Sequence, residues 1–242
     1  MILTVDAGNT RIKWGLRRDG AWQQVGALPT AEAHALTGAI GEGHRFERML
    51  VANVAGASVQ AAIERSARTL GCSAEFVEAC TAQCGVRSSY DDPSQLGPDR
   101  WAALIGARRL LSGACLAVNA GTALTVDALS EEGAFLGGII VPGIELMRRA
   151  LDSHTAGLRM QPGEVRFFPA NTGDAIMSGA AQALAGAIER MAAFMQESGQ
   201  SVVRVVLSGG AAPVLHPLLA LDTVVVEHLV LEGLAAIAEE GC

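Results

Sequence analysis

Val5-Asp6-Ala7-Gly8 recurs in the chain as Val118-Asn119-Ala120-Gly121, at an offset of 113 in the numbering. A second pair of segments, Asp19-Gly20-Ala21-Trp22 and Glu132-Gly133-Ala134-Phe135, has the same offset. Each copy begins with a short apolar strand, passes through a turn of small residues into a second strand, and reaches a polar hairpin turn. Because both matches share one offset, we interpret them as an internal duplication.

Strands and helices alternate after each hairpin, which is typical of the α/β class. Apolar patterning predicts strands at residues 49–54 and 202–207 and helices at residues 58–70, 98–111, 172–196 and 232–239. No Pro-rich or Ser-rich linker separates the two copies. We therefore expect two packed lobes that share one cleft, an N-terminal lobe of residues 1–113 and a C-terminal lobe of residues 114–242.

The composition is that of a chain that folds. Half of the 242 residues are hydrophobic and 18% are charged, unlike a disordered chain. The formal net charge is -7 and only 4% of the residues are aromatic. Sequence-independent nucleic-acid binding needs basic grooves and stacking rings, so no nucleic-acid partner is expected.

The cysteines and histidines show neither disulfide nor metal-ligand spacing. Five cysteines are an odd number without a C-x-x-C pair, so we expect reduced thiols. The cysteines are Cys72, Cys80, Cys84, Cys115 and Cys242.

The sequence shows no sign of a signal peptide or a membrane span. The N-terminus has a carboxylate at Asp6 and no basic region before an apolar run. No apolar stretch reaches the ~18 residues that span a membrane. These features, together with the reduced thiols, favour a cytoplasmic protein without membrane attachment.

The first small-residue turn carries groups suited to phosphate. In Asp6-Ala7-Gly8-Asn9-Thr10-Arg11-Ile12-Lys13, Gly8 permits a sharp turn and close backbone approach, and Thr10 offers a hydroxyl. Lys13 supplies a compact positive charge for phosphate oxygens, and Asp6 could hold Mg²⁺ directly or through water. Taken alone, the segment could equally be an ordinary hairpin with a solvated lysine.

Two further turns are similar to the first. Asn119-Ala120-Gly121-Thr122-Ala123 adds a hydroxyl at Thr122, and Ser208-Gly209-Gly210 follows an apolar strand. This order is expected where the backbone approaches a nucleotide. Two facing hairpins would hold a polyphosphate from opposite sides. Three such turns after three strands indicate a nucleotide-binding protein.

Gly97-Pro98-Asp99-Arg100 places opposite charges at the start of a predicted helix. Phosphoryl transfer needs a group that orients or deprotonates the acceptor hydroxyl, and positive charge near the phosphate oxygens. Asp99 and Arg100 supply one of each. Amide groups at the helix N-terminus also favour an anion such as a substrate carboxylate. A helix start alone would explain Pro98 and Asp99 but not Arg100.

Together these segments resemble the type III pantothenate kinases, members of the acetate and sugar kinase/Hsp70/actin superfamily. The resemblance covers essentially the whole chain and includes Gly137-Gly138, Pro142-Gly143, Asn171-Thr172-Gly173 and Gly209-Gly210. It implies two duplicated ribonuclease H-like (actin-like ATPase) lobes with mixed sheets flanked by helices. It also implies transfer of the γ-phosphoryl group of Mg-ATP to the primary hydroxyl of pantothenate. The product, 4'-phosphopantothenate, begins coenzyme A synthesis.

The resemblance also assigns roles to residues, with Asp99 as the implied catalytic base. The implied ATP-binding residues are Asp6, Ala7, Gly8, Asn9, Thr10, Arg11, Ile12, Lys13 and Thr122. The implied pantothenate-binding residues are Tyr90, Gly97, Pro98, Asp99, Arg100 and Thr172. Tyr90 could otherwise be a loop or core aromatic residue, and Thr172 could also be the N-cap of the long helix.

One position departs from the family pattern. Many members carry Asp where this chain has Asn119, at a site for potassium or ammonium. Asn keeps an oxygen ligand but loses the charge, so we expect weaker binding of a monovalent cation, or none.

The resemblance further implies a homodimer with the substrate site near the subunit interface. Gly179, Ala183 and Gly186 lie at helical spacing and would let another helix approach closely, which makes the long helix a candidate for the dimer contact. The same small residues could instead pack within the lobe.

Two other functions stay open at this stage. The family has also been described as an accessory factor for virulence gene activation, which would make the chain a non-catalytic transcriptional accessory factor. A sugar or small-alcohol kinase of the same superfamily is the other alternative. Catalysis is favoured by a set of five residues, because a binding role alone would not require all of them. The set is Asp6, Lys13, Asp99, Arg100 and Thr122.

Overall fold

The computed structural model describes residues 1–41, 43–155, 158, 161–200 and 203–240. Contacts within the chain divide it into two compact units. The first unit comprises Met1–Leu111 together with Leu229–Cys242, and the second comprises Ser112–His228. This division differs from lobes of residues 1–113 and 114–242 chiefly in the C-terminal segment, which joins the first unit.

A five-stranded mixed sheet forms the centre of the first unit. Its strand order is β3-β2-β1-β4-β5, with β1 antiparallel to β2 and parallel to β4. Residues 49–54, predicted as a strand, correspond to β4. The strands are β1 (Ile2–Ala7), β2 (Arg11–Arg18), β3 (Ala21–Pro29), β4 (Arg48–Asn53) and β5 (Ala74–Phe76).

The second unit repeats this sheet. Its order is β10-β9-β8-β11-β12, and β8 is antiparallel to β9 and parallel to β11. The first and last residues of β8 and of β1 are related by the same offset as the sequence repeats, so the duplication predicted from the sequence is confirmed. Position 202 of the predicted strand 202–207 lies outside the described residues. The strands are β8 (Cys115–Ala120), β9 (Ala123–Leu129), β10 (Phe135–Pro142), β11 (Arg204–Ser208) and β12 (Thr223–Val225).

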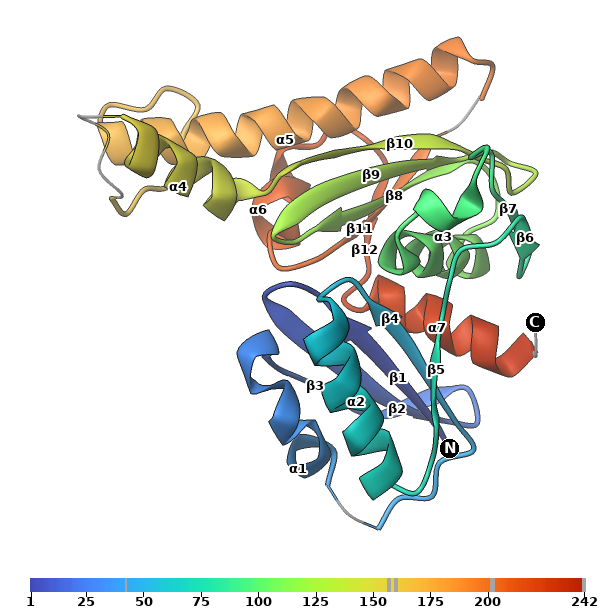
Figure 1. Cartoon of the computed structure of the whole chain (residues 1–242). Coiled ribbons are helices and arrows are strands. Elements are labelled where there is room, and N and C mark those ends of the chain that lie inside the picture. Colours follow the sequence, from blue (N-terminus) through green and yellow to red (C-terminus); the bar gives the residue numbers. More distant parts are fainter. Residues whose placement is uncertain (42, 156–157, 159–160, 201–202, 241–242) are drawn as a thin grey trace. The chain divides into compact units, whose positions relative to one another are not determined.

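Helices cover both faces of the first sheet (Figure 1). Every second side chain of β1, namely Leu3, Val5 and Ala7, packs in a core with α1 (Leu36–Ile40) and α2 (Ala57–Thr69). The alternating geometry of a strand turns Thr4 and Asp6 to the opposite face, where α7 (Leu229–Glu240) contacts β1. The remaining elements are η1 (Thr30–Ala35), β6 (Ala82–Gln83), β7 (Val86–Arg87), η2 (Pro93–Gln95) and α3 (Pro98–Leu110).

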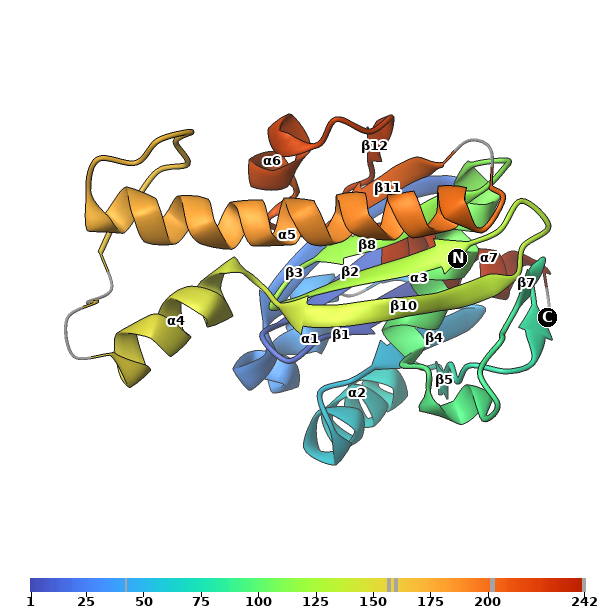
Figure 2. The same ribbon diagram turned by 90° about the horizontal axis from the view of Figure 1, so that it is seen from above.

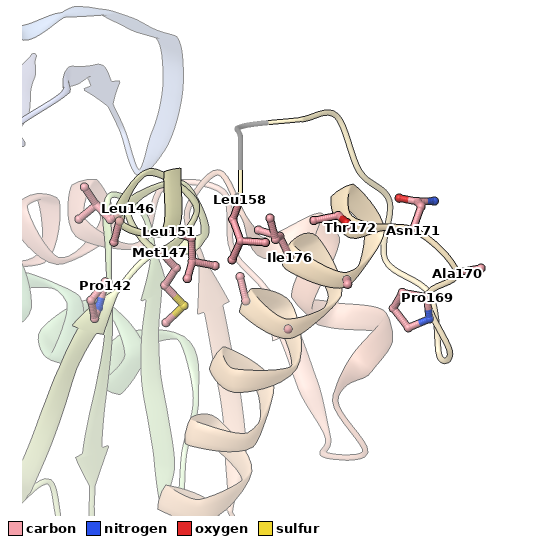
Figure 3. Close-up of a pocket in the computed structure, with 14 residues that line it drawn as sticks. Pro142, Leu146, Met147, Leu151, Leu158, Pro169, Ala170, Asn171, Thr172 and Ile176 are labelled. Carbon is pink, nitrogen blue, oxygen red and sulfur yellow. The ribbon is translucent and has the colours of Figure 1, made fainter. Parts of the chain in front are cut away.

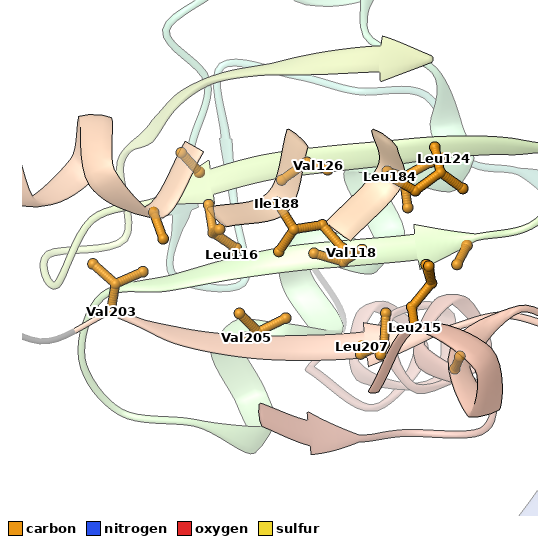
Figure 4. Packing of buried hydrophobic residues seen from close by; sticks show 14 of the residues in the cluster. Leu116, Val118, Leu124, Val126, Leu184, Ile188, Val203, Val205, Leu207 and Leu215 are labelled. Carbon is orange, nitrogen blue, oxygen red and sulfur yellow. The ribbon is translucent and has the colours of Figure 1, made fainter. Parts of the chain in front are cut away.

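One long helix dominates the second unit. Figure 2 shows α5 (Thr172–Glu197) running along the sheet. Leu184 and Ile188 of α5 pack among Leu116, Val118 and Val126 of the sheet (Figure 4), and these side chains are fully or almost fully buried. The remaining helices are α4 (Ile144–His154), α6 (Ala212–Leu215) and η3 (His216–Leu218).

The C-terminal helix α7 joins the first unit for two physical reasons. Gly233 lies so close to α3 that an added Cβ would clash with the carbonyl of Ala102. Buried Arg17 in β2 donates to Glu232 at 3.0 Å and to Glu239 at 2.8 Å, and both carboxylates belong to α7. The close approach of α7 to α3 and the buried ion pairs of Arg17 therefore hold α7 in the first unit. Sequence order alone had assigned this helix to the second lobe.

Four cysteines, Cys72, Cys80, Cys84 and Cys115, are free thiols, and Cys242 lies outside the described residues. Within the described part of the chain, no helix combines the length and apolarity needed to cross a membrane.

Candidate active site

The predicted site residues fall in both units. The first unit contains the turn of residues 6–13, Tyr90 and Gly97-Pro98-Asp99-Arg100, and the second contains Asn119, Thr122 and Thr172.

The first turn begins where β1 ends. Asp6 lies opposite Lys13 in the register of β1 and β2. The N–H of Gly8 donates to the carbonyl of Arg11 at 3.1 Å and closes the turn. A Cβ at Gly8 would lie 3.2 Å from the same carbonyl oxygen, so a larger residue would push the turn open. The structure thus pairs one negative and one positive side chain next to a tight turn.

Burial changes the chemistry of Asp6. The side chain is only 8% exposed, and burial raises the pKa of the Asp6 carboxyl from its ordinary 3.8 to about 7. The positive charge of Lys13 lowers this pKa, and the negative charge of Asp99 raises it. Lys13 and Asp99 therefore both lie close enough to Asp6 to change its pKa, although Asp99 is far from Asp6 in sequence.

The start of α3 holds Asp99. Pro98 is the first helical residue, as the sequence predicted, and Gly97 is the N-cap. The Asp99 Oδ1 accepts a hydrogen bond from the Arg100 N–H at 2.9 Å. A Cβ at Gly97 would lie 2.7 Å from this oxygen, so a larger residue would require the Asp99 carboxylate to move. Burial raises the pKa of Asp99, while the bond from the Arg100 N–H and the Arg100 charge lower it.

Arg100 connects this helix start to the preceding loop. Its side chain is buried, and its Nη1 donates to the Tyr90 hydroxyl at 3.4 Å. The neighbouring Trp101 is fully buried, and its indole N–H donates to Gln83 at 2.9 Å. The structure therefore brings together Tyr90, Arg100 and Asp99, three residues of the predicted pantothenate-binding set.

This part of the first unit suits hydroxyl and phosphate chemistry. A carboxylate with a raised pKa can take a proton from an alcohol near neutral pH, and the neighbouring guanidinium can hold an anion. Asp6 fits Mg²⁺, because a buried carboxylate gains from a cation and Mg²⁺ in kinases uses one or two carboxylates with phosphate oxygens. The described residues contain no group of three or more His, Cys, Asp or Glu side chains that could hold a metal ion.

The turn after β8 in the second unit has the same frame. The Gly121 N–H donates to Ala123 at 3.0 Å, and the Gly143 N–H donates to the carbonyl of Thr122 at 2.9 Å. Thr122 is exposed, and Asn119 is half-buried at the end of β8, opposite Thr125 in β9.

Gly209, after β11, has a φ of +100°, and an added Cβ would clash with Ala120. The third predicted glycine turn is therefore a close approach of backbone to backbone, at the same sheet edge as the turn after β8.

Thr172 lies at the start of α5, beside a pocket of about 1050 Å³ between α4 and α5 (Figure 3). The pocket is lined mostly by apolar side chains, among them Leu146, Leu151 and Ile176. Thr172 is the first helical residue and not the N-cap. Asn171 is the N-cap, and its side chain accepts from the Asp174 N–H at 2.9 Å. The alternative role of Thr172 as N-cap is therefore wrong, because its neighbour already fills that place.

Sequence reasoning missed two polar side chains that hold these segments. Gln83 anchors Trp101, and Thr30 hydrogen-bonds the turn after β1. A signal for Thr30 was present, because Pro29-Thr30 and Pro142-Gly143 share the offset of the other repeats. Gln83 has no comparable pattern.

Comparisons with known proteins find a matching family model and relatives that are similar over nearly the whole chain. The family model for type III pantothenate kinase matches residues 2–193. A type III pantothenate kinase of Aromatoleum aromaticum is 52% identical over 240 residues, which cover 99% of this chain and 98% of the relative. One from Azoarcus sp. is 51% identical over 240 residues, with 98% of this chain and 90% of the relative covered.

A solved structure from Sinorhizobium meliloti, described as a 2-dehydro-3-deoxygalactonokinase, is 16% identical with a TM-score of 0.65, and the match covers 99% of each chain. At this identity the likeness shows the fold alone, which is that of the actin-like ATPases and sugar kinases. The family model and the two relatives span most of the chain at high identity. The chain therefore belongs to the type III pantothenate kinase family.

Proposed function

We propose that this chain is a pantothenate kinase that transfers the γ-phosphoryl group of ATP to the primary hydroxyl of pantothenate. The observation that carries the proposal is the grouping of Asp6, Lys13 and Asp99 in the first unit, where Lys13 and Asp99 both act on the buried Asp6 carboxyl. The second support is membership of a family whose relatives are named for this reaction.

Asp99 is the proposed base. Its carboxylate accepts the proton of the pantothenate hydroxyl as that oxygen bonds to the γ-phosphorus. The bond from the γ-phosphorus to the bridging oxygen breaks, and ADP leaves with its electrons. The raised pKa of Asp99 keeps it basic enough to share this proton, and activity should fall as the pH drops through that raised pKa.

The cationic side chains balance the phosphate and carboxylate charges. Lys13, beside the first turn, is the proposed contact of ATP phosphate oxygens. Arg100 and the N-terminal amides of α3 face the anionic acceptor, and the Tyr90 hydroxyl helps to orient the Arg100 guanidinium at 3.4 Å. Mg²⁺, when bound with ATP through Asp6, supplies positive charge that neutralises the phosphates.

The finer assignments extend this proposal. Thr122 contacts ATP and Thr172 contacts pantothenate by the family resemblance. A potassium or ammonium ion at Asn119 binds weakly, because an amide offers an oxygen without charge. We also propose a cytoplasmic homodimer that uses α5, since Gly179, Ala183 and Gly186 are exposed rather than packed within the second unit.

The test is an acceptor panel. Purified protein is incubated with ATP, MgCl₂ and either pantothenate, glucose or glycerol, and the products are identified by mass spectrometry. We expect 4'-phosphopantothenate alone. A phosphorylated sugar or glycerol instead would favour the sugar or small-alcohol kinase, and a folded protein that phosphorylates none of them would favour the non-catalytic accessory factor.

A further inference from the structure

We propose that Thr30 is a positioning residue for the turn Gly8-Asn9-Thr10, an inference that rests on the proposed phosphate-binding role of this turn. Thr30 follows β3 and is half-buried. Its Oγ1 donates to the carbonyl of Gly8 at 2.7 Å, and its N–H donates to the carbonyl of Thr10 at 3.1 Å. One residue therefore holds both ends of the turn.

The hydroxyl bond sets the direction of a main-chain amide. The peptide between Gly8 and Asn9 is trans, so its C=O and N–H point in opposite directions. Since the carbonyl of Gly8 points at the Thr30 hydroxyl, the N–H of Asn9 points to the other side of the turn. Main-chain amides in such turns are the usual donors to phosphate oxygens, and their value depends on orientation before the ligand arrives.

A comparison with the second unit distinguishes the two hydrogen bonds that Thr30 makes. Gly143 holds the equivalent position in the second copy of the repeat, and its N–H donates to the carbonyl of Thr122 at 2.9 Å. The main-chain bond is thus part of the repeated frame. Glycine has no hydroxyl, so the side-chain bond belongs to the turn next to Asp6 and Lys13, and not to the frame.

The contacts of the turn indicate why the extra bond is needed there. The connection between β1 and β2 is Gly8-Asn9-Thr10, one residue longer than Gly121-Thr122 between β8 and β9. Asn9 and Thr10 are exposed, so little packing restrains the longer turn. A second tether, through the Thr30 hydroxyl, compensates for the added residue.

The experiment measures both substrates in Thr30→Val, which keeps the branched shape and the N–H but loses the hydroxyl. We expect the KM for ATP to rise about 3- to 10-fold, the factor that corresponds to one lost hydrogen bond. We expect kcat and the KM for pantothenate to change less than about twofold. Thr30→Ser, which restores the hydroxyl, should return the KM for ATP to within about twofold of wild type.

A matched control is Thr37→Val in α1, a half-buried threonine of the same unit outside the turn. It should leave both KM values unchanged. An unchanged KM for ATP in Thr30→Val, or equal increases in both KM values, would overturn the proposal, because the second result reports a general structural role. Failure of Thr30→Ser to restore ATP binding would also overturn it.

Two further measurements keep the test decisive. If Thr30→Val loses its folded circular dichroism spectrum, ATP affinity of Thr30→Ser and Thr30→Ala is compared by calorimetry, and equal affinities contradict the tether. Calorimetry also separates the two proposals. Wild-type protein that binds ATP but phosphorylates no pantothenate would refute the proposed function. The effect of the Thr30 variants on ATP affinity would still test the role of Thr30.

Discussion

The turn after β1 and the turn after β8 share a backbone frame but differ in charge. Both are closed by a glycine N–H bond, at 3.1 Å and 3.0 Å, and both are held by the residue that follows the third strand of the sheet. At the end of the first strand, the first unit pairs Asp6 with Lys13, and the second pairs Asn119 with Thr125.

This difference separates what the duplication preserved from what it did not. Main-chain hydrogen bonds and glycine approaches depend on the fold, and they recur in both units. Charged side chains are required by the reaction and not by the fold. Asp6, Lys13 and Asp99 all belong to the first unit. We therefore expect substitutions of these charged residues to affect phosphoryl transfer more than substitutions in the turn after β8.

Asp99→Asn should have the largest effect on the reaction. Loss of the base should lower kcat about 10²- to 10⁴-fold, while ATP affinity changes less than about twofold, because Asp99 acts on the acceptor. Steady-state kinetics and calorimetry with ATP check the two parts. A comparable loss of ATP affinity would contradict the acceptor-side role of Asp99.

Equivalent positions of the two turns can then be compared directly. Lys13→Ala should raise the KM for ATP about 10- to 100-fold, the range for a lost charge-assisted contact. Thr125→Val, at the equivalent register position opposite Asn119, should change it less than about threefold. Equal effects of the two substitutions, measured by initial rates over a range of ATP concentrations, would refute the division of roles between the turns.

Asp6→Asn should raise stability in a pH-dependent way. Since the folded pKa of Asp6 lies at about 7, above its ordinary 3.8, ionisation destabilises the folded protein increasingly as the pH rises between these values. The melting temperature of the variant should therefore be about 3 to 10 °C higher than that of the wild type at pH 8. At pH 4 the two melting temperatures should be nearly equal. Asn119→Asp is the matched change in the second turn. A gain from Asp6→Asn that is equally large at pH 4 would exclude this ionisation as its cause.

The smallest effect concerns the monovalent cation. Replacing potassium by sodium at constant ionic strength should change the wild-type rate less than about threefold, because Asn119 offers no charge to the ion. Asn119→Asp should make the rate depend more strongly on potassium or ammonium. A strong potassium requirement of the wild type would show that the amide at Asn119 is sufficient for the ion.

The internal repeat and the local sequence patterns predicted much of this structure. The constant offset between the repeats predicted two similar sheets, and Gly97-Pro98 predicted the start of α3. The place of α7 could not be predicted, because it depends on Arg17 meeting carboxylates that lie 215 and 222 residues away in the chain. The N-cap of α5 was missed because Asn171 and Thr172 are both good caps, and only the backbone distinguishes them.

The raised pKa of Asp6 also lay beyond sequence reasoning. It arises from burial and from Asp99, which packing brings near the end of β1. The role of Thr30 is a similar case, since its hydroxyl contacts Gly8 across 22 residues.

The most direct test of the account is a phosphorus NMR time course of the wild-type protein with Mg-ATP and pantothenate, run beside Asp99→Asn. The account predicts that the γ-phosphate signal of ATP declines as a phosphomonoester signal of 4'-phosphopantothenate grows at the same rate, and that Asp99→Asn shows neither change on this timescale. Release of inorganic phosphate without a phosphomonoester, or equal rates in the two proteins, would contradict it.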